Sequence, residues 1–439
     1  MKRVLYLASS VALLASMVLA GNALAAHPSA KAKTITVRLC SSGPLAVPAL
    51  HQLWQGVNNG INVAIKQWKP KLSKVHVKVQ PLLVLDDGNA LTNNYDTSKE
   101  AANADTCNAT KNTVGYIGTL NSGAAEVSEP RLNRDHMLMI SPANTNPTLT
   151  SPKSRKAQEP LTYAHKIPYV TYYRTVTTDK LQGPAGADFA KKVLKKSTYF
   201  LVDDGTLYGE GLATYFKAEA KKKGMKIVGS GRIDSTNSGT QSSTSLTIAQ
   251  EIKAKNPSMV YCGCNSNTAN DLPKDLRTVD GYKKTFMGGD ALYNTAWLSS
   301  KNGGAGAGAT NNDATSVGPD PSKAAKTFKK LYKKDFPSFY KNPGIQAYDA
   351  PAYDAASIAL MGVYDAAKAG KLKGGITKER DAVVKYVHSI TFKGATGTTR
   401  FDKNGDTTNK IISIYATQKV KGNLTWVFKK QLKPSGSPT

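Results

Sequence analysis

The feature that most constrains the fold is a regular alternation, beginning at Thr34, between short strand-like segments and longer segments of helical spacing. Residues 34–40 form a short β-rich run. In the stretch that follows, apolar residues recur every three to four positions, namely Leu53, Trp54, Val57, Ile61, Ala64, Ile65 and Trp68. This spacing is typical of one face of a helix. A strand followed by a helix, repeated along the chain, predicts βαβ units and therefore a parallel sheet with helices on both faces.

The alternation runs in two series, separated by residues 144–168, which are rich in Pro, Ser, Thr and Lys and predict a loop. The first series predicts strands over residues 34–40, 75–85, 114–120 and 137–141. The second predicts strands over residues 172–176, 198–202, 226–228, 259–262 and 285–287. After the glycine-rich residues 303–308, helices are expected over 322–334, 350–369 and 377–387. The chain then ends in hairpin strands over 398–401, 411–417 and 420–428, around an Asn404-Gly405 turn. The fold class predicted is α/β, with two doubly wound sheets in succession.

The N-terminus has the pattern of an export signal. Lys2 and Arg3 precede an apolar run over residues 4–20, and Ala23-Leu24-Ala25 supplies small residues for cleavage after Ala25. The cleavage site carries no lipid-accepting Cys, and no later apolar run is long enough to cross a membrane. We therefore expect a periplasmic or secreted protein.

The formal charge of +28 raises nucleic acid or an anionic surface as partners. Only ten of the 59 basic residues are Arg, the residue favoured for bidentate phosphate and base recognition, and the lysine pairs recur at the spacing of solvated helix faces. We expect no nucleic-acid partner.

The four cysteines, Cys40, Cys107, Cys262 and Cys264, leave their pairing open. Cys262 and Cys264 point to one face of a strand, which suits either a bond or two small apolar fillers. A zinc site would need further ligands at a recognisable spacing, and none is nearby. The six histidines show no metal or triad spacing, and the chain has neither a Gly-x-Ser-x-Gly elbow nor a phosphate-binding Gly-Lys-Ser/Thr loop. We therefore expect no metal, no cofactor and no catalysis.

Polar residues placed directly after predicted strands are the candidate site. In doubly wound sheets ligands bind outside the carboxyl ends of the strands, where loops expose backbone N–H groups. Asn121 and Ser122 follow one strand and open a helix, and Ala143 and Thr145 follow the next strand. The two hydroxyls with their adjacent N–H groups suit a carboxylate, although either segment also suits an ordinary helix N-cap. In the second series, Asp290 suits a ligand cation, and Tyr208 suits an apolar part of the ligand.

Several of these segments resemble the leucine/isoleucine/valine-binding proteins of ABC importers, a type I periplasmic binding protein family. The resemblance rests on a Ser-Pro-Ala-Asn-Thr element within residues 138–150 and a Tyr-Gly-Glu-Gly element within 207–211. It also includes Arg174-Thr175-Val176 with Gln182-Gly183, and residues 286–290 and 353–356. The segments occur in family order over almost the whole chain after the signal.

The resemblance implies two lobes joined by three crossings, with a hinge that closes over ligand. It implies that Ser122 and Thr145 hold an α-carboxylate, that the Ala143 carbonyl and Asp290 take an α-ammonium, and that Tyr208 covers the ligand. Three departures put side-chain specificity in doubt. A family tyrosine is replaced near Asn265, Asp290 stands where the family usually has Glu, and residues 42–46 lack the usual aromatic residue.

The expected function is that of a substrate-binding protein that delivers a branched-chain or other amino acid to the membrane permease of an ABC importer, as a monomer. The alternatives are a receptor for an amide, urea or aromatic acid, and a soluble sensory protein. The expected lobes are residues 34–170 with about 300–395, and about 171–299 with about 396–432, after a signal over residues 1–25.

Overall fold

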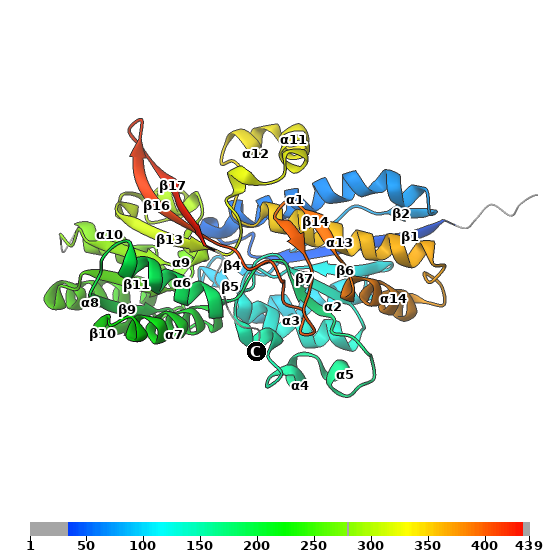
Figure 1. The fold of residues 1–439 in the computed structure, drawn as a ribbon, viewed down its shortest axis with the longest axis horizontal. Helices are drawn as coiled ribbons and strands as arrows, with labels where there is room; N and C mark the ends of the chain where they lie inside the picture. The colour runs from blue at the N-terminus through cyan, green and yellow to red at the C-terminus, as the bar shows by residue number, and fades with distance from the viewer. Residues whose placement is uncertain (1–33, 279–280, 433–439) are drawn as a thin grey trace, which may run out of the picture. The chain divides into compact units, whose positions relative to one another are not determined.

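The structure, a computed structural model, describes residues 34–278 and 281–432, so the predicted signal over residues 1–25 lies outside the described residues. Two main sheets organise the chain, one of six strands and one of seven (Figure 1). The protein therefore has the two-lobed α/β fold that the alternation predicts. Within the described residues, no helix combines the length and the apolarity needed to cross a membrane.

The first lobe is built on a parallel sheet with the order β2-β1-β6-β7-β8, in which β3 also pairs with β1. Its strands are β1 (Ile35–Gly43), β2 (Val77–Val79), β3 (Leu83–Asp86), β6 (Thr113–Ile117), β7 (Leu138–Ser141) and β8 (Tyr172–Arg174). The single strand expected over 75–85 is interrupted by residues 80–82. Pro81 has no N–H to give to a ladder, so a break at this point has a simple backbone cause.

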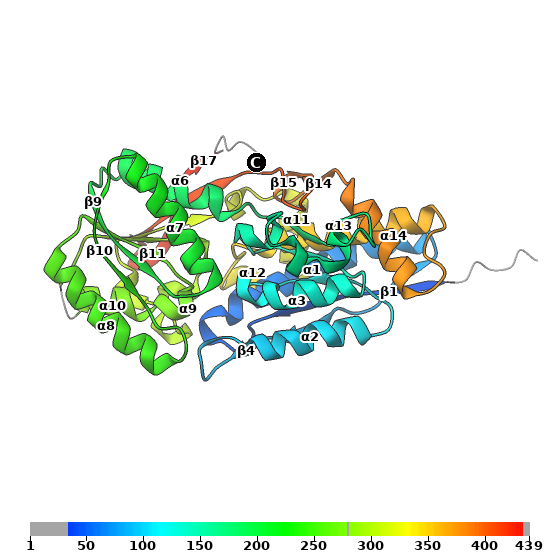
Figure 2. The ribbon, with the colours of Figure 1, turned by 90° about the horizontal axis from the view of Figure 1, so that it is seen from below.

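Helices cover both faces of this sheet, because alternate side chains of each strand point to opposite sides. In β7, Leu138 and Ile140 share a core with α1 and α13, whereas Met139 packs with α2 and α3. Figures 1 and 2 show the strands lying between these two helix pairs. The helices of this lobe are α1 (Pro48–Ser73), α2 (Thr97–Ala109), α3 (Ser122–Arg134), α13 (Asp349–Lys368) and α14 (Ile376–His388).

The second lobe is built on the order β10-β9-β11-β12-β13-β16-β17, in which the last two strands are antiparallel. Its strands are β9 (Thr198–Asp203), β10 (Lys226–Arg232), β11 (Met259–Gly263), β12 (Thr285–Gly288), β13 (Asn312–Ser316), β16 (Ile412–Val420) and β17 (Asn423–Leu432). The helices that follow its parallel strands in sequence, with α6 before them, are α6 (Asp179–Lys192), α7 (Leu207–Lys222), α8 (Ser238–Lys255), α9 (Ser266–Ala269) and α10 (Asp271–Thr278). Two further helices, α11 (Lys326–Asp335) and α12 (Pro337–Lys341), precede α13.

Strand pairing differs from the sequence-based expectation in two places. β8 pairs with β7 in the first sheet and β13 pairs with β12 in the second, so the expected boundaries near residues 171 and 300 would assign both strands to the wrong sheet. The expected strand over 398–401 pairs back with residues 392–394, as the hairpin of β14 (Phe392–Gly394) and β15 (Gly397–Thr399), rather than with β16. Local alternation predicted β8 but no strand over residues 312–316, and the partner of a strand depends on where the chain crosses between sheets.

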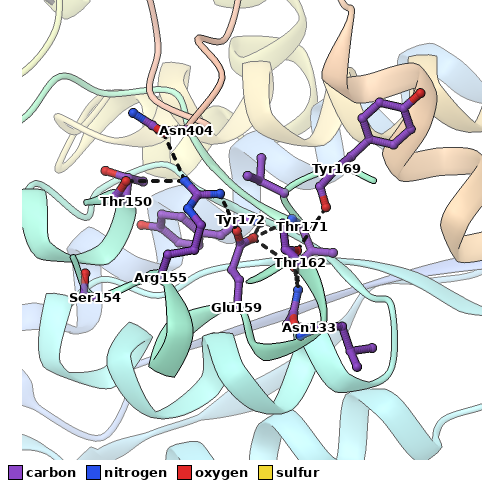
Figure 3. A network of polar contacts seen from close by, with 12 residues as sticks. Asn133, Thr150, Ser154, Arg155, Glu159, Thr162, Tyr169, Thr171, Tyr172 and Asn404 are labelled. Carbon is purple, nitrogen blue, oxygen red and sulfur yellow. Dashed lines mark hydrogen bonds and ion pairs between the residues drawn. The ribbon is translucent and has the colours of Figure 1, made fainter. Parts of the chain in front are cut away.

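The segment over 144–168, expected to be a loop, contains a 3₁₀ turn at Pro147–Thr150 and the short helices α4 (Arg155–Gln158) and α5 (Pro160–Tyr163). Figure 3 shows how a polar network fixes it. The buried Glu159 carboxylate accepts hydrogen bonds from the Thr171 and Tyr172 backbone N–H groups at 2.6 and 2.9 Å. Arg155 pairs with Glu159 at 3.0 Å and reaches Asn404 at 3.3 Å. The contacts of Glu159 with residues 171 and 172 and of Arg155 with Asn404 are non-local, so helical spacing alone does not reveal them.

All four cysteines are bonded, which answers the question left open by the sequence. The bond between Cys40 and Cys107 joins β1 to α2, and the bond between Cys262 and Cys264 joins the end of β11 to the residue after Gly263. The alternative of two unbonded fillers is wrong for the second pair. No group of three metal-ligating side chains occurs within residues 34–278 and 281–432.

Candidate functional site

The first face of the site is made by the ends of two neighbouring strands, β6 and β7. Because these strands pair in parallel, the loops that follow them leave the same edge of the sheet. Ser122 begins α3 after β6, and its Oγ accepts a hydrogen bond at 3.3 Å from the Asn146 N–H in the loop after β7. The structure thus brings together the two segments that the sequence separates by more than twenty residues.

Asn121 occupies the N-cap position of α3, but its side chain does not cap the helix. Its Nδ2 instead donates at 3.1 Å to Oδ1 of Asn265, which follows β11 in the second lobe. The ordinary helix-cap reading is therefore wrong for Asn121, whose amide connects the two lobes.

A buried arginine fixes the loop that carries Ala143 and Thr145. The guanidinium of Arg174 donates to the backbone carbonyls of Asn144 and Asn146, on either side of Thr145, at 3.1 and 2.9 Å. Its Nε pairs with the Asp406 carboxylate at 2.6 Å, so the charge is balanced where it is wholly buried. The Asn144 side chain adds bonds to the Thr119 and Leu120 carbonyls. This support positions the loop before any ligand arrives.

The second face centres on Asp290, which follows β12 and is 2% exposed. Oδ1 accepts hydrogen bonds from Gln182 Nε2 at 2.7 Å and from the Tyr208 hydroxyl at 2.9 Å. Oδ2 accepts a short hydrogen bond from the hydroxyl of Tyr348, which precedes α13 of the first lobe. Burial raises the pKa of the Asp290 carboxyl, while the hydrogen bonds from Tyr348, Gln182 and Tyr208 lower it.

A second buried acid lies on the same side of the site. Asp179, at the start of α6, has a pKa raised well above the ordinary range, first by burial and then by the charge of Asp290, while the Thr145 hydroxyl lowers it. Its backbone N–H donates to the Thr145 carbonyl at 2.9 Å. Burial and the charge of Asp290 disfavour ionisation of Asp179, which leaves Asp290 as the carboxylate of this face that suits a cation.

A small cavity of about 20 Å³ lies between the two faces. Six of the seven predicted site residues line it: Asn121, Ser122, Ala143, Tyr208, Asn265 and Asp290. Thr145 does not line this cavity, although it is buried beside the others at 1% exposure. A space of this size suits about one water molecule, so a larger ligand requires movement of the lobes or side chains.

The remaining lining residues were not predicted from the sequence: Leu50, Leu53, Leu120, Ala291 and Tyr348. Leu50 and Leu53 lie in the first two turns of α1, the helix that follows β1, and helical spacing marks Leu53 as a core residue. Gln182, which holds Asp290, was part of the family resemblance but was not selected as a site residue. The sequence therefore revealed the polar groups that follow strands and missed the apolar lining and Tyr348, which precedes α13.

Larger hollows of about 460 and 420 Å³ lie elsewhere, the second beside Tyr169 and Lys385 of α14. Neither is lined by any of the seven predicted residues. We place the candidate site at the small cavity because the converging polar groups of both lobes lie there.

Comparison with known proteins agrees with this fold. Residues 62–420 match the family described as the receptor family ligand binding region, and the chain belongs to that family. A Leu/Ile/Val-binding protein homolog of Brucella melitensis is 26% identical over 301 residues, which cover 68% of this chain and 71% of the relative. The resemblance to the Leu/Ile/Val-binding proteins is confirmed, and this relative is described as a binding protein.

Two solved structures have the same fold. The leucine binding protein LivK of Thermotoga maritima superposes with a TM-score of 0.71 and 21% identity, over 91% of this chain and 99% of its own. A solute binding protein of Rhodopseudomonas palustris HaA2, in complex with p-hydroxybenzoic acid, gives a TM-score of 0.70 and 15% identity, over 91% and 97% of the two chains. The predicted type I periplasmic binding protein fold is confirmed.

Proposed function

We propose that this protein is the extracytoplasmic substrate-binding component of an ABC importer and binds an amino acid between its lobes. The observation that carries the proposal is the pairing of two chemically different faces at one cavity. Hydroxyls and loop backbone lie on the first lobe, and a buried carboxylate lies on the second. A zwitterionic ligand needs hydrogen-bond donors for its carboxylate and a carboxylate for its ammonium group.

In this proposal Ser122 and Thr145 hold the α-carboxylate, and the Ala143 carbonyl and Asp290 take the α-ammonium. Tyr208 covers the ligand from the second lobe. The apolar residues that share the cavity, Leu50, Leu53 and Leu120, suit an aliphatic side chain and favour a branched-chain amino acid. When the lobes open, the Tyr348 hydroxyl leaves Asp290, and the ligand ammonium takes its place.

The proposal extends to partner and place. The Rhodopseudomonas palustris HaA2 neighbour is described as a solute binding protein of an ABC transporter, which supports delivery of the ligand to a membrane permease. The N-terminal pattern supports cleavage after Ala25 and release into the periplasm or the medium, where we propose that the protein acts as a monomer. By strand pairing, we propose that the crossings between lobes follow β8 and β13 and precede β16. In this role the protein catalyses no reaction.

A second candidate is a receptor for an aromatic acid. The Rhodopseudomonas palustris neighbour was solved with such a ligand, and Asp290 is already bonded to Tyr208, Gln182 and Tyr348 without any ligand cation. A ligand with no ammonium group would leave these bonds in place. The sensory alternative shares the same ligand site and differs only in its partner.

A thermal-shift screen against the standard amino acids, small amides and aromatic acids tests the proposal. A ligand that binds only the folded state raises the melting temperature by mass action. We expect the largest shifts from aliphatic amino acids. Shifts from benzoates alone would select the second candidate, and no shift from any α-amino acid would contradict the first.

Closure can be tested with the ligand that the screen identifies. A ligand that contacts both lobes selects a closed state through contacts that an open state cannot make. Small-angle scattering should give a smaller radius of gyration with ligand than without it. Identical profiles, with Ser122 and Asp290 both essential for binding, would contradict delivery by hinge closure.

A further inference from the structure

A hairpin of the first lobe contacts two helices of the second lobe beside the candidate site. It consists of β4 (Gly88–Asn89), β5 (Asn94–Tyr95) and the turn between them, and we call residues 88–95 the clasp hairpin. At its tip, Asn93 Nδ2 donates to the Asn267 backbone carbonyl at 2.6 Å and to Gln241 Oε1 at 3.4 Å. Asn267 Nδ2 donates back to the Asn93 carbonyl, and Gln241 Nε2 donates to the Thr92 carbonyl at 3.1 Å.

The base of the clasp hairpin is held by its own lobe. Asp86 Oδ1 accepts hydrogen bonds from the backbone N–H groups of Gly88 and Ala46, both at 2.9 Å. Lys99 Nζ donates to the Gly88 carbonyl at 2.6 Å. Because the base is anchored to the first lobe, the bonds at the tip connect the two lobes to each other.

The two residues of the second lobe that bond the tip of the clasp hairpin are buried and lie close to the site. Gln241, in α8, is 2% exposed, and Asn267, in α9, is fully buried. Asn267 follows Asn265, a cavity-lining residue, by two positions. Buried amides that lose their partners must regain them from water, so separating the tip from the second lobe disrupts several bonds at once.

The conformation of the tip suits asparagine. Asn93 has a φ of 50°, in the left-handed region that most side chains avoid and that asparagine and glycine tolerate. This backbone lets its carbonyl accept from Asn267 while its side chain donates to the same residue. A glycine at this position keeps the backbone conformation and removes only the amide.

We propose that the clasp hairpin is a positioning element for ligand binding that holds the closed lobes together and slows ligand release. The inference rests on the proposed function, in which the lobes close over ligand. Asn93, Thr92 and Gln241 do not line the cavity, so they act on the opening of the lobes rather than on the choice of ligand. Ligand enters open lobes, and the clasp favours the closed state, so loss of the clasp speeds dissociation and does not slow association.

Stopped-flow kinetics with the amino acid identified by the thermal-shift screen tests this inference. Asn93→Gly should raise the dissociation rate constant about tenfold and should not lower the association rate constant. Gln241→Ala, on the opposite lobe, should also raise the dissociation rate constant. Because the two side chains bond each other, the free-energy effect of the double variant on dissociation should be smaller than the sum of the two single effects. The matched control is Leu91→Ser, since Leu91 is 84% exposed at the same tip and should not change the rates.

An unchanged dissociation rate in both Asn93→Gly and Gln241→Ala would overturn the clasp, as would a loss of association rate alone. A ligand-free measurement separates this result from failure of the proposed function. Small-angle scattering of Asn93→Gly without ligand should give a larger mean radius of gyration than the unaltered protein. An equal radius, with Leu91→Ser as the control, would overturn the clasp even if no amino acid binds.

Discussion

In the proposed function, the two faces of the candidate site hold the two charged groups of the ligand by different means. The first face uses hydroxyls and backbone from loops that follow β6 and β7, braced by the Arg174 guanidinium. The second uses one buried carboxylate, Asp290, whose three donors come from α6, α7 and the residue before α13. A face made of local loops depends on little beyond its own strands, whereas a single buried charge depends on the whole arrangement around it.

The difference predicts unequal responses to mutation. Asp290→Asn keeps the shape of the second face but removes its charge, so the affinity for a zwitterionic amino acid should fall by on the order of 2–5 kcal/mol, because the ligand cation is left buried and unpaired. Isothermal titration calorimetry measures this loss directly.

The matched control is Asp188→Asn, which removes a carboxylate of the same lobe that pairs with Lys192 and Lys223 at the surface. It should leave the affinity unchanged. If Asp290→Asn proved equally harmless with the best natural ligand, the amino-acid function would fail although the fold would stand.

On the first face each substitution should reduce the ligand affinity less than Asp290→Asn does, because two hydroxyls share the carboxylate. Ser122→Ala and Thr145→Ala each remove one hydroxyl that would bond a carboxylate, and a hydrogen bond to a charged group contributes about 1.5–3 kcal/mol. Calorimetry should show about tenfold weaker binding, or more, for each variant. Ser128→Ala, within the same helix α3, is the control, because its hydroxyl bonds the Ala124 carbonyl. Full affinity in both site variants would show that the carboxylate binds elsewhere.

The two faces should also differ in their response to pH. Burial raises the pKa of Asp290, and only the ionised carboxylate attracts an ammonium group. Affinity should therefore be full above that pKa and fall as the pH drops through it, by up to about tenfold per pH unit. Binding curves measured between neutral and acidic pH should show this fall in the unaltered protein and in Ser122→Ala, but not in Asp290→Asn. A decline of the same size in Asp290→Asn would assign the pH dependence to another group.

The same contrast explains what the sequence revealed. Asn121, Ser122, Ala143 and Asp290 follow strands, and strand ends of a doubly wound sheet are visible in the alternation itself. Leu50 lines the cavity from α1 and Tyr348 from the position before α13, and spacing predicts only that such residues are buried. Nothing in a local pattern tells which buried helix residue meets the other lobe.

As with the site, the sequence predicted one part of the fold and not another. Spacing predicted most strand and helix positions and the presence of two main sheets, although β13 was not predicted as a strand. The sheet to which β8 and β13 belong was not predicted, because it depends on where the chain crosses between lobes. The short helices α4 and α5 were missed because contacts of Glu159 with residues beyond them stabilise the segment.

The most direct test of the central claim, that the two faces read the two charges of one zwitterion, compares three ligands by calorimetry. These are leucine, 4-methylpentanoate, which lacks the ammonium group, and 3-methylbutylamine, which lacks the carboxylate. The account predicts that leucine binds at least about a hundredfold more tightly than either analogue, since each analogue leaves one charged face unpaired. Binding of 4-methylpentanoate as tight as that of leucine would contradict it, because Asp290 would then contribute nothing to recognition.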